Sequence, residues 1–271
     1  MYLEYYGLKE PPFNITPNPR FLFFSAKHRE AFNHLLYGIR ERKGFVQLTG
    51  EVGAGKTTLC RALLEQLGPA FSTALIINPV MTADQLMKAI GMELNLQVQG
   101  MDRLETVAEI NHFLLQQMAQ NKDTVVIIDE AQDLTWDLLE QVRLLSNLET
   151  DERKLLQIVL MGQPELRDRL NDHSLRQLRQ RITVRYHLNP LRRNEIGQYI
   201  QHRLQVSGAN GAPYFTGGAL WRIYNYSKGI PRLINAICDK CLLAGYVGQR
   251  KKIDFATVGR AQRELEGQID L

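Results

Sequence analysis

One octapeptide gives the strongest indication of the fold of this chain: Gly50-Glu51-Val52-Gly53-Ala54-Gly55-Lys56-Thr57. The apolar run 45–49 precedes it and a helical segment, 56–67, follows it, so a glycine-rich loop joins a predicted strand to a predicted helix. Glycines let a backbone fold closely around phosphate, and the free N–H groups of such a loop and of the helix start attract an anion. In this setting the pattern G-x-x-x-x-G-K-[ST] predicts a P-loop.

Two side chains of the octapeptide carry the expected chemistry. Lys56 is placed to reach the β- and γ-phosphates of a nucleoside triphosphate, and the Thr57 hydroxyl is placed to ligate Mg²⁺. An accidental glycine-rich turn is the alternative, and the flanking strand and helix argue against it. The predicted nucleotide-binding residues are the loop and the start of the helix: Gly50, Glu51, Val52, Gly53, Ala54, Gly55, Lys56, Thr57 and Thr58.

A second motif places two carboxylates at the end of a buried strand. The apolar run 125–128 leads directly into Asp129 and Glu130, and open α/β sheets bind ligands at the carboxyl ends of their strands. We expect Asp129 to hold Mg²⁺ through its water shell and Glu130 to orient and polarise the attacking water. Paired acids also suit the solvated first turn of a helix, but the buried strand before them favours the catalytic interpretation.

The sequence indicates ATP rather than GTP as the nucleotide. Residues 121–124, Asn-Lys-Asp-Thr, resemble the guanine-reading N-K-x-D, but the aspartate stands one place too early. Asp129 is followed by Glu-Ala-Gln, without a glycine three residues on. The predicted ligand is therefore Mg²⁺-ATP.

Two further polar residues are candidates for the same site. Gln163 follows the predicted strand 156–161 and is the candidate sensor of the γ-phosphate and the lytic water; a glutamine that only satisfies its loop is the alternative. Arg232 stands at the start of a later helix, after Gly229 and Pro231. It is placed to fold back onto the γ-phosphate and couple nucleotide state to domain angle, unless it is only a surface cap residue.

Residues 167–193 form a strongly basic segment, with eight arginines, no lysine and two aspartates. Arginine suits bidentate contacts with phosphate or carboxylate. One interpretation is an intersubunit edge that supplies an arginine finger to a neighbour's ATP. Arg176, Arg179 and Arg181 lie in the region concerned, with Arg181 preferred and Arg179 next. A DNA-backbone patch and a solvated basic face are the alternatives.

Composition and periodicity set the fold class. A length of 271 residues with 44% hydrophobic and 23% charged residues and a net charge of +4 excludes a disordered chain, a collagen-like chain and a disulfide scaffold. Apolar strands alternate with helices up to about residue 190, which predicts an α/β fold with a parallel five-stranded sheet covered on both faces. Helices alone follow, so we expect a P-loop core over 1–190 and a small all-helical lid over 191–271. The predicted strands are 45–49, 73–77, 124–128, 156–161 and 182–188, and the predicted helices of the second domain are 192–206, 216–227, 230–247 and 254–265.

Two other features receive structural interpretations. Residues 1–24 contain seven aromatic residues among four prolines, which predicts an arm wrapped on the core with buried rings; an adenine or partner contact is compatible with this. Cys238 and Cys241 form a C-x-x-C, but no second pair completes a zinc site, and their spacing on an apolar helix face predicts two buried core cysteines. Three cysteines and the lack of a signal peptide favour a reducing cytoplasm.

Together these features resemble an AAA+ ATPase across nearly the whole chain. The likeness narrows to the ExeA/GspA group, the general secretion pathway protein A type, which includes the related mannose-sensitive pilus biogenesis ATPase. The stretches that are similar to that group are Tyr-Tyr-Gly-Leu-Lys-Glu-Pro-Pro-Phe at 5–13, Pro-Asn-Pro-Arg at 17–20, Gly-Gln-Pro-Glu-Leu at 162–166 and Asn-Pro-Leu at 189–191, followed by Glu195-Ile196 and Tyr199-Ile200.

This resemblance implies a cytoplasmic ATPase that works at the bacterial inner membrane. It would help a secretin or pilus machine assemble through the peptidoglycan, as a homo-oligomer with an inner-membrane B-type partner. Members often continue with a transmembrane helix and a periplasmic peptidoglycan-binding domain, and this sequence stops at Leu271, before either. The rival interpretation is a DNA-binding AAA+ ATPase of the transposition-helper type, and a third is a nucleotide-gated switch with negligible turnover.

Overall fold

The computed structural model describes residues 1–150 and 153–267. Contacts between residues divide the chain into two compact units, which we describe separately. The sheet unit comprises Arg29–Gly50 and Cys60–Leu188. The helical unit comprises Met1–His28, Glu51–Leu59 and the chain from Asn189 onward, so the predicted P-loop is grouped with the helices by its contacts.

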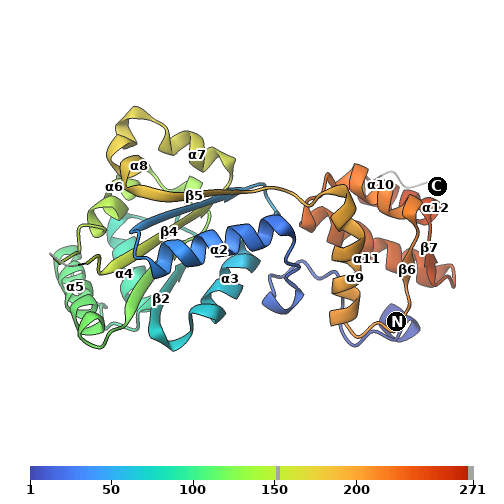
Figure 1. Cartoon of the computed structure of the whole chain (residues 1–271), viewed down its shortest axis with the longest axis horizontal. Helices are drawn as coiled ribbons and strands as arrows, with labels where there is room; N and C mark the ends of the chain where they lie inside the picture. The colour runs from blue at the N-terminus through green and yellow to red at the C-terminus, as the bar shows by residue number, and fades with distance from the viewer. Residues whose placement is uncertain (151–152, 268–271) are drawn as a thin grey trace. The chain divides into compact units, whose positions relative to one another are not determined.

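The sheet unit is built on five parallel strands in the order β2-β3-β4-β1-β5 (Figure 1). This confirms the predicted fold class. The order places β4 between β1 and β3, the two strands that lead into the predicted motifs. The strands are β1 (Phe45–Gly50), β2 (Phe71–Ile76), β3 (Asp123–Ile128), β4 (Leu156–Gly162) and β5 (Ile182–Leu188).

Both faces of the sheet are covered, as the near-continuous apolar strands require. Val126 and Ile128 pack in one cluster with residues of α4, α6 and α7, and Val125 and Ile127, which alternate to the opposite face, are also fully buried. The helices that lie wholly or mostly in this unit are α2 (Ala26–Arg40), α3 (Lys56–Leu67), α4 (Ala83–Glu93), α5 (Arg103–Ala119), α6 (Trp136–Leu145), α7 (Pro164–Leu170) and α8 (Arg176–Arg181).

Local sequence explains where several of these elements begin. Thr82 with Gln85 and Asp102 with Glu105 form capping boxes at the starts of α4 and α5, which satisfy backbone N–H groups that a helix leaves free. The predicted strand 73–77 is displaced: β2 begins at Phe71, directly after a 3₁₀ turn over Gly68–Ala70.

The helical unit packs its helices around a second apolar cluster. The prediction of an all-helical second domain is wrong in one detail, because β6 and β7 form a parallel two-stranded pair there. Both are two residues long, too short to show a strand period in the sequence. Its elements are α1 (Tyr2–Tyr6), α9 (Ile196–Val206), β6 (Tyr214–Phe215), α10 (Gly217–Ser227), α11 (Pro231–Val247), β7 (Lys252–Ile253) and α12 (Phe255–Leu265).

The N-terminal aromatic segment belongs to this helical cluster rather than to the sheet unit, where we expected it. The rings of Tyr6 and Phe13 are buried there, as the sequence predicts. The buried Arg203 of α9 holds the segment through its Nε, which donates to the carbonyl of Pro12 (2.6 Å), and its Nη2, which donates to the carbonyl of Asn14 (3.0 Å). A long-range contact of this kind leaves no local sequence signal.

The cysteine interpretation is confirmed. Cys238 and Cys241 lie fully buried on one face of α11. Burial raises the pKa of the Cys241 thiol to about 12, so this thiol stays protonated at neutral pH. Among the residues that the structure describes, none of the helices combines the length and the apolar character needed to cross a bilayer.

Candidate nucleotide-binding and hydrolysis site

The glycine-rich octapeptide joins strand to helix as predicted. Gly50 ends β1, and Lys56 begins α3. Gly53 has φ of +78° and Gly55 has φ of +100°, which side chains with a Cβ rarely adopt, so both positions need glycine. The loop therefore has the left-handed backbone turns that a phosphate-binding loop uses.

Backbone carbonyls of the loop accept hydrogen bonds from within the helical unit. The Glu51 carbonyl accepts from the N–H of Ala54 (3.0 Å) and from the Lys56 ammonium (3.2 Å). Lys56 is only 6% exposed, although burying an ammonium is costly. Its charge is thus kept at the loop rather than in bulk water.

Arg232 lies against the loop, which is where the sequence places it. Its backbone N–H, in the first turn of α11, donates to the carbonyl of Gly53 (3.2 Å). A Cβ on Gly53 would lie 2.4 Å from Cβ of Arg232, so the arginine stem occupies the space that a side chain at Gly53 would need. The backbone and the aliphatic stem of Arg232 therefore pack directly on the loop.

The two acids follow β3 in different environments. Asp129 is 2% exposed, and its backbone N–H donates to the carbonyl of Ile76 on β2 (2.8 Å), so it continues the ladder of the sheet. Its Oδ1 accepts from the N–H of Glu130 (2.9 Å). Burial, and to a smaller extent the nearby Asp129 carboxylate, raises the pKa of the Cys60 thiol to about 12. Glu130 has φ of +52°, which turns the chain sharply away from the strand.

Two glutamines hold the carboxylate of Glu130. Its Oε2 accepts from Nε2 of Gln132 (2.9 Å) and from Nε2 of Gln163 (3.3 Å). The other end of the Gln132 amide, Oε1, accepts from the backbone N–H of Gln163 (3.0 Å). The sequence predicts Gln163 from its place after β4. Gln132 follows Glu130 by only two residues, but the sequence analysis gives it no role, because its link to Gln163 on the loop after β4 is a long-range contact.

Arg181, the preferred arginine-finger candidate, is occupied within its own unit. Its Nη1 donates to the carbonyl of Arg143 (3.2 Å), to Oγ of Ser146 (2.5 Å) and to Oδ1 of Asn147 (2.6 Å). These groups lie at the carboxyl end of α6, where carbonyls lack helical partners and a positive charge is favourable. Arg181 thereby stabilises a helix end.

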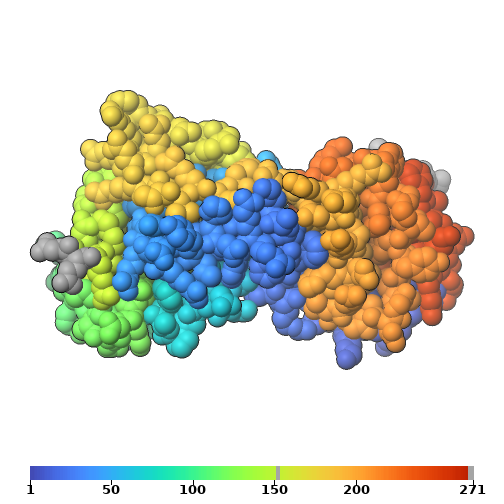
Figure 2. All heavy atoms as spheres, viewed as in Figure 1, coloured from blue at the N-terminus to red at the C-terminus, as the bar shows by residue number. Residues whose placement is uncertain are grey.

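The second finger candidate, Arg179, borders a basic cavity on the sheet unit. The cavity measures about 290 Å³, and its lining includes Arg167, Arg185 and His187 but no carboxylate. Within the described ranges, no acidic side chain pairs with Arg179 or Arg185. Figure 2 shows the segment that carries these arginines, in yellow, on the surface of the sheet unit. Nη2 of Arg185 donates to the carbonyl of Arg179 (2.5 Å), and both arginines line the cavity, where their charge favours an anion.

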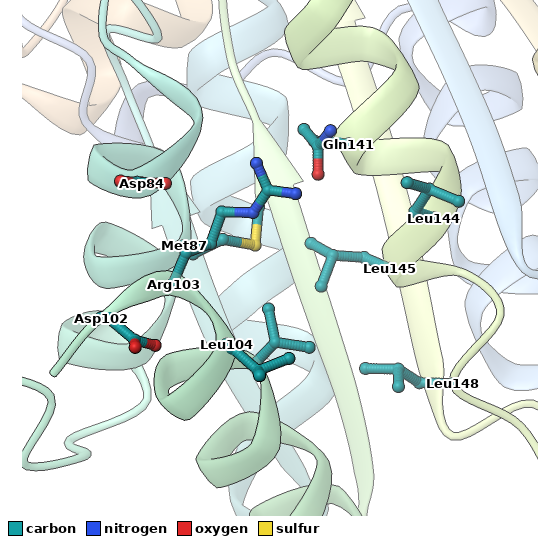
Figure 3. A pocket seen from close by; sticks show the side chains of 10 residues that line it. Asp84, Met87, Asp102, Arg103, Leu104, Gln141, Leu144, Leu145 and Leu148 are labelled. Carbon is teal, nitrogen blue, oxygen red and sulfur yellow. The ribbon is translucent and has the colours of Figure 1, made fainter.

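Another cavity, of about 550 Å³, lies between α4, α5 and α6. Its walls are largely aliphatic, and Figure 3 shows Leu104, Leu145 and Leu148 around it, with Arg103 among them. None of the motif residues lines it, so it is separate from the candidate nucleotide site.

Comparison with known proteins fits this geometry. Residues 39–170, which span the P-loop, the acidic pair and Gln163, match the AAA domain family. Over 98% of its length the chain is 48% identical to general secretion pathway protein A of Aeromonas hydrophila. The chain is a GspA-like AAA protein. This confirms the resemblance seen in the sequence. The GspA-like chain spans 49% of the length of that relative, about half of it.

Solved structures support the same fold for the GspA-like chain. Cdc6p from Pyrobaculum aerophilum has a TM-score of 0.69 and 20% identity, over 88% of this chain and 66% of that one. The Aeropyrum pernix ORC2 protein, solved in ADPNP-ADP complexes, has a TM-score of 0.69 and 15% identity, over 98% of this chain and 74% of that one. At these identities the likeness concerns the fold.

Proposed function

We propose that this GspA-like chain binds and hydrolyses Mg²⁺-ATP. The observation that carries the proposal is the loop geometry: glycines at positive φ and a buried lysine, between β1 and α3 of an AAA domain. Lys56 and the loop N–H groups from Gly50 to Thr58 would hold the phosphates, and Thr57 and Asp129 offer the hydroxyl and carboxylate oxygens that Mg²⁺ prefers. When bound, Mg²⁺ neutralises phosphate charge.

Glu130 would activate the attacking water in this proposal. Its carboxylate is an acceptor and therefore suits a general base, and Gln163, beside it, would sense the γ-phosphate. Lys56→Ala should abolish nucleotide binding. Glu130→Gln removes the base but keeps the shape, so it should retain ATP binding and lose steady-state phosphate release. Unimpaired hydrolysis by Glu130→Gln would contradict the assigned role.

We assign the arginine finger of an oligomer to Arg179 rather than to Arg181. The support is the internal capping contact of Arg181 and the position of Arg179 at the wall of the basic cavity. Arg179→Ala should lose activity only where oligomers form, and mixing it with Lys56→Ala should restore activity, because each variant supplies what the other lacks. No rescue on mixing would argue against action in trans.

The cellular role that we propose is ATP-driven assembly of a secretion or pilus machine at the cytoplasmic side of the inner membrane. The support is the identity to general secretion pathway protein A. A homo-oligomer, an inner-membrane B-type partner and peptidoglycan are the proposed partners, the last through a region beyond this chain. Stimulation of phosphate release by peptidoglycan or by a membrane partner would support this role.

The basic cavity keeps a DNA-linked function as the second candidate. Arg167, Arg179 and Arg185 line the cavity with positive charge, and although Arg167 pairs with Asp168 at its rim (3.7 Å), no carboxylate lines the cavity itself, which suits a phosphate backbone as well as a nucleotide. Duplex DNA that binds in a salt-dependent manner and stimulates phosphate release would favour this candidate. A protein that binds ATP without steady-state turnover would instead be a nucleotide-gated switch.

A further inference from the structure

A histidine from the N-terminal segment touches the back of the P-loop. His28 is 3% exposed, and its Nε2 lies 3.1 Å from the carbonyl oxygen of Ala54. Since a carbonyl oxygen only accepts, Nε2 carries the proton and donates. The sequence motifs do not account for this residue, which lies outside the P-loop pattern.

Ser25 fixes the orientation of that ring. Its hydroxyl oxygen accepts from the backbone N–H of His28 (3.2 Å) and so caps the first turn of α2. The same oxygen lies 2.8 Å from Nδ1 of the ring. In a neutral imidazole protonated at Nε2, Nδ1 is an acceptor, so the Ser25 hydroxyl donates to it. Burial lowers the pKa of His28, although the Ala54 carbonyl opposes this, and the neutral ring is favoured.

The contact determines which way one loop peptide faces. In a trans peptide the carbonyl and the next N–H point in opposite directions, so an Ala54 carbonyl directed at His28 turns the N–H of Gly55 away from it. The ring also closes the space behind Gly55, where an added Cβ would lie 3.3 Å from Nε2. The neighbouring carbonyl, of Gly53, is held by Arg232 as described above. Two consecutive peptides of the loop are thus fixed from outside the loop.

We propose that His28 is a positioning residue of the P-loop, which holds the Ala54–Gly55 peptide with its N–H toward the phosphate site before nucleotide arrives. The inference deepens the proposed ATP binding and rests on it. Nucleotide binds productively only to molecules whose loop is already formed, so the apparent affinity scales with that fraction. Loss of the bond should weaken ADP binding about tenfold, the equivalent of one typical buried hydrogen bond.

The test compares His28→Leu with His28→Gln. Leucine fills the space but cannot donate, whereas the Gln Nε2 can reach the Ala54 carbonyl and donate as the imidazole does. We expect His28→Leu to weaken ADP affinity in calorimetric titration about tenfold and to speed hydrogen exchange in the nucleotide-free loop, residues 50–57. His28→Gln should restore both to within about threefold. Equal impairment in the two variants, or no change in His28→Leu, would overturn the proposal.

Two controls separate this inference from folding and from the proposed function. If His28→Leu fails to fold, as judged by its thermal transition, Ser25→Ala replaces it, since it keeps the ring and removes its orientation. It should then speed exchange in the same loop, and unchanged exchange would refute the role. If the wild-type protein does not bind ADP, the proposed function fails, and the exchange of the nucleotide-free loop still decides the role of His28.

Discussion

The contact between Gln132 and Glu130 leads to a test of how the carboxylate that we propose as the water-activating base is held. We choose Gln132→Glu because it keeps the shape and keeps the oxygen that accepts from the Gln163 backbone (3.0 Å). It removes the amide that donates to Glu130 (2.9 Å) and replaces it with a like charge. A hydrogen bond to a charged group contributes about 1.5–3 kcal/mol. If Glu130 must be held to activate water, kcat should fall about 10- to 150-fold.

The assay is steady-state phosphate release against ATP concentration, with ADP affinity measured separately. A positioning role predicts a fall in kcat with ADP affinity unchanged within about twofold. The side chain of Gln132 bonds to Glu130 and to Gln163, and ADP lacks the γ-phosphate that Gln163 would sense. Gln163→Met should have a smaller effect, about threefold, since its bond to Glu130 is longer, at 3.3 Å.

Asp133→Asn is the matched control. The Asp133 carboxylate also accepts from Gln132 Nε2 (3.2 Å), but it is exposed, and the bond of Asp133 to the Glu130 carbonyl (2.9 Å) comes from its backbone N–H, which the substitution keeps. Its kcat should stay within about twofold of the wild-type value, because an exposed bond contributes little. If Gln132→Glu kept the wild-type kcat, or lost ADP affinity while its kcat stayed unchanged, the positioning role of Gln132 would be refuted.

Three further predictions concern stability and reactivity. Arg181→Met removes the charged cap of α6 and should lower the free energy of unfolding by about 1–3 kcal/mol in urea titrations. A loss below about 0.5 kcal/mol would show that the cap does not stabilise the protein. Burial lowers the pKa of His28 below its unfolded value, so the stability given by the neutral ring is complete above pH of about 6.5 and is lost as pH falls through the lowered pKa. The free energy of unfolding of His28→Gln should therefore change less between pH 7.5 and 5.5 than that of the wild-type protein. An equal change in the two proteins would contradict this. Burial raises the pKa of Cys60, Cys238 and Cys241. A thiol reagent at pH 7.5 should therefore label these cysteines only when the protein unfolds. Rapid labelling of the native protein would argue against their burial.

Much of the fold was predictable because its signals are local. Each strand of the sheet is a short apolar run between turn residues, and helix starts such as Thr82 and Asp102 carry their own capping partners three residues on. The acid pair after β3 and Gln163 after β4 follow neighbouring parallel strands directly, so the strand order brings them to one edge of the sheet. The strands β6 and β7 could not be predicted from hydrophobic periodicity, because two residues are too few to show a period.

The glycine-rich loop, its lysine and the two carboxylates could be identified without a structure, because they are defined by residue types at fixed short spacings. Tertiary structure decided which partners those groups meet. It showed that Arg181, a candidate finger, caps a helix, it placed the aromatic segment in the helical unit, and it brought His28 to the loop and Gln163 to Gln132 and Glu130. Each of these contacts joins residues that are not adjacent along one helix or strand, and such contacts depend on how whole elements pack rather than on neighbouring residues.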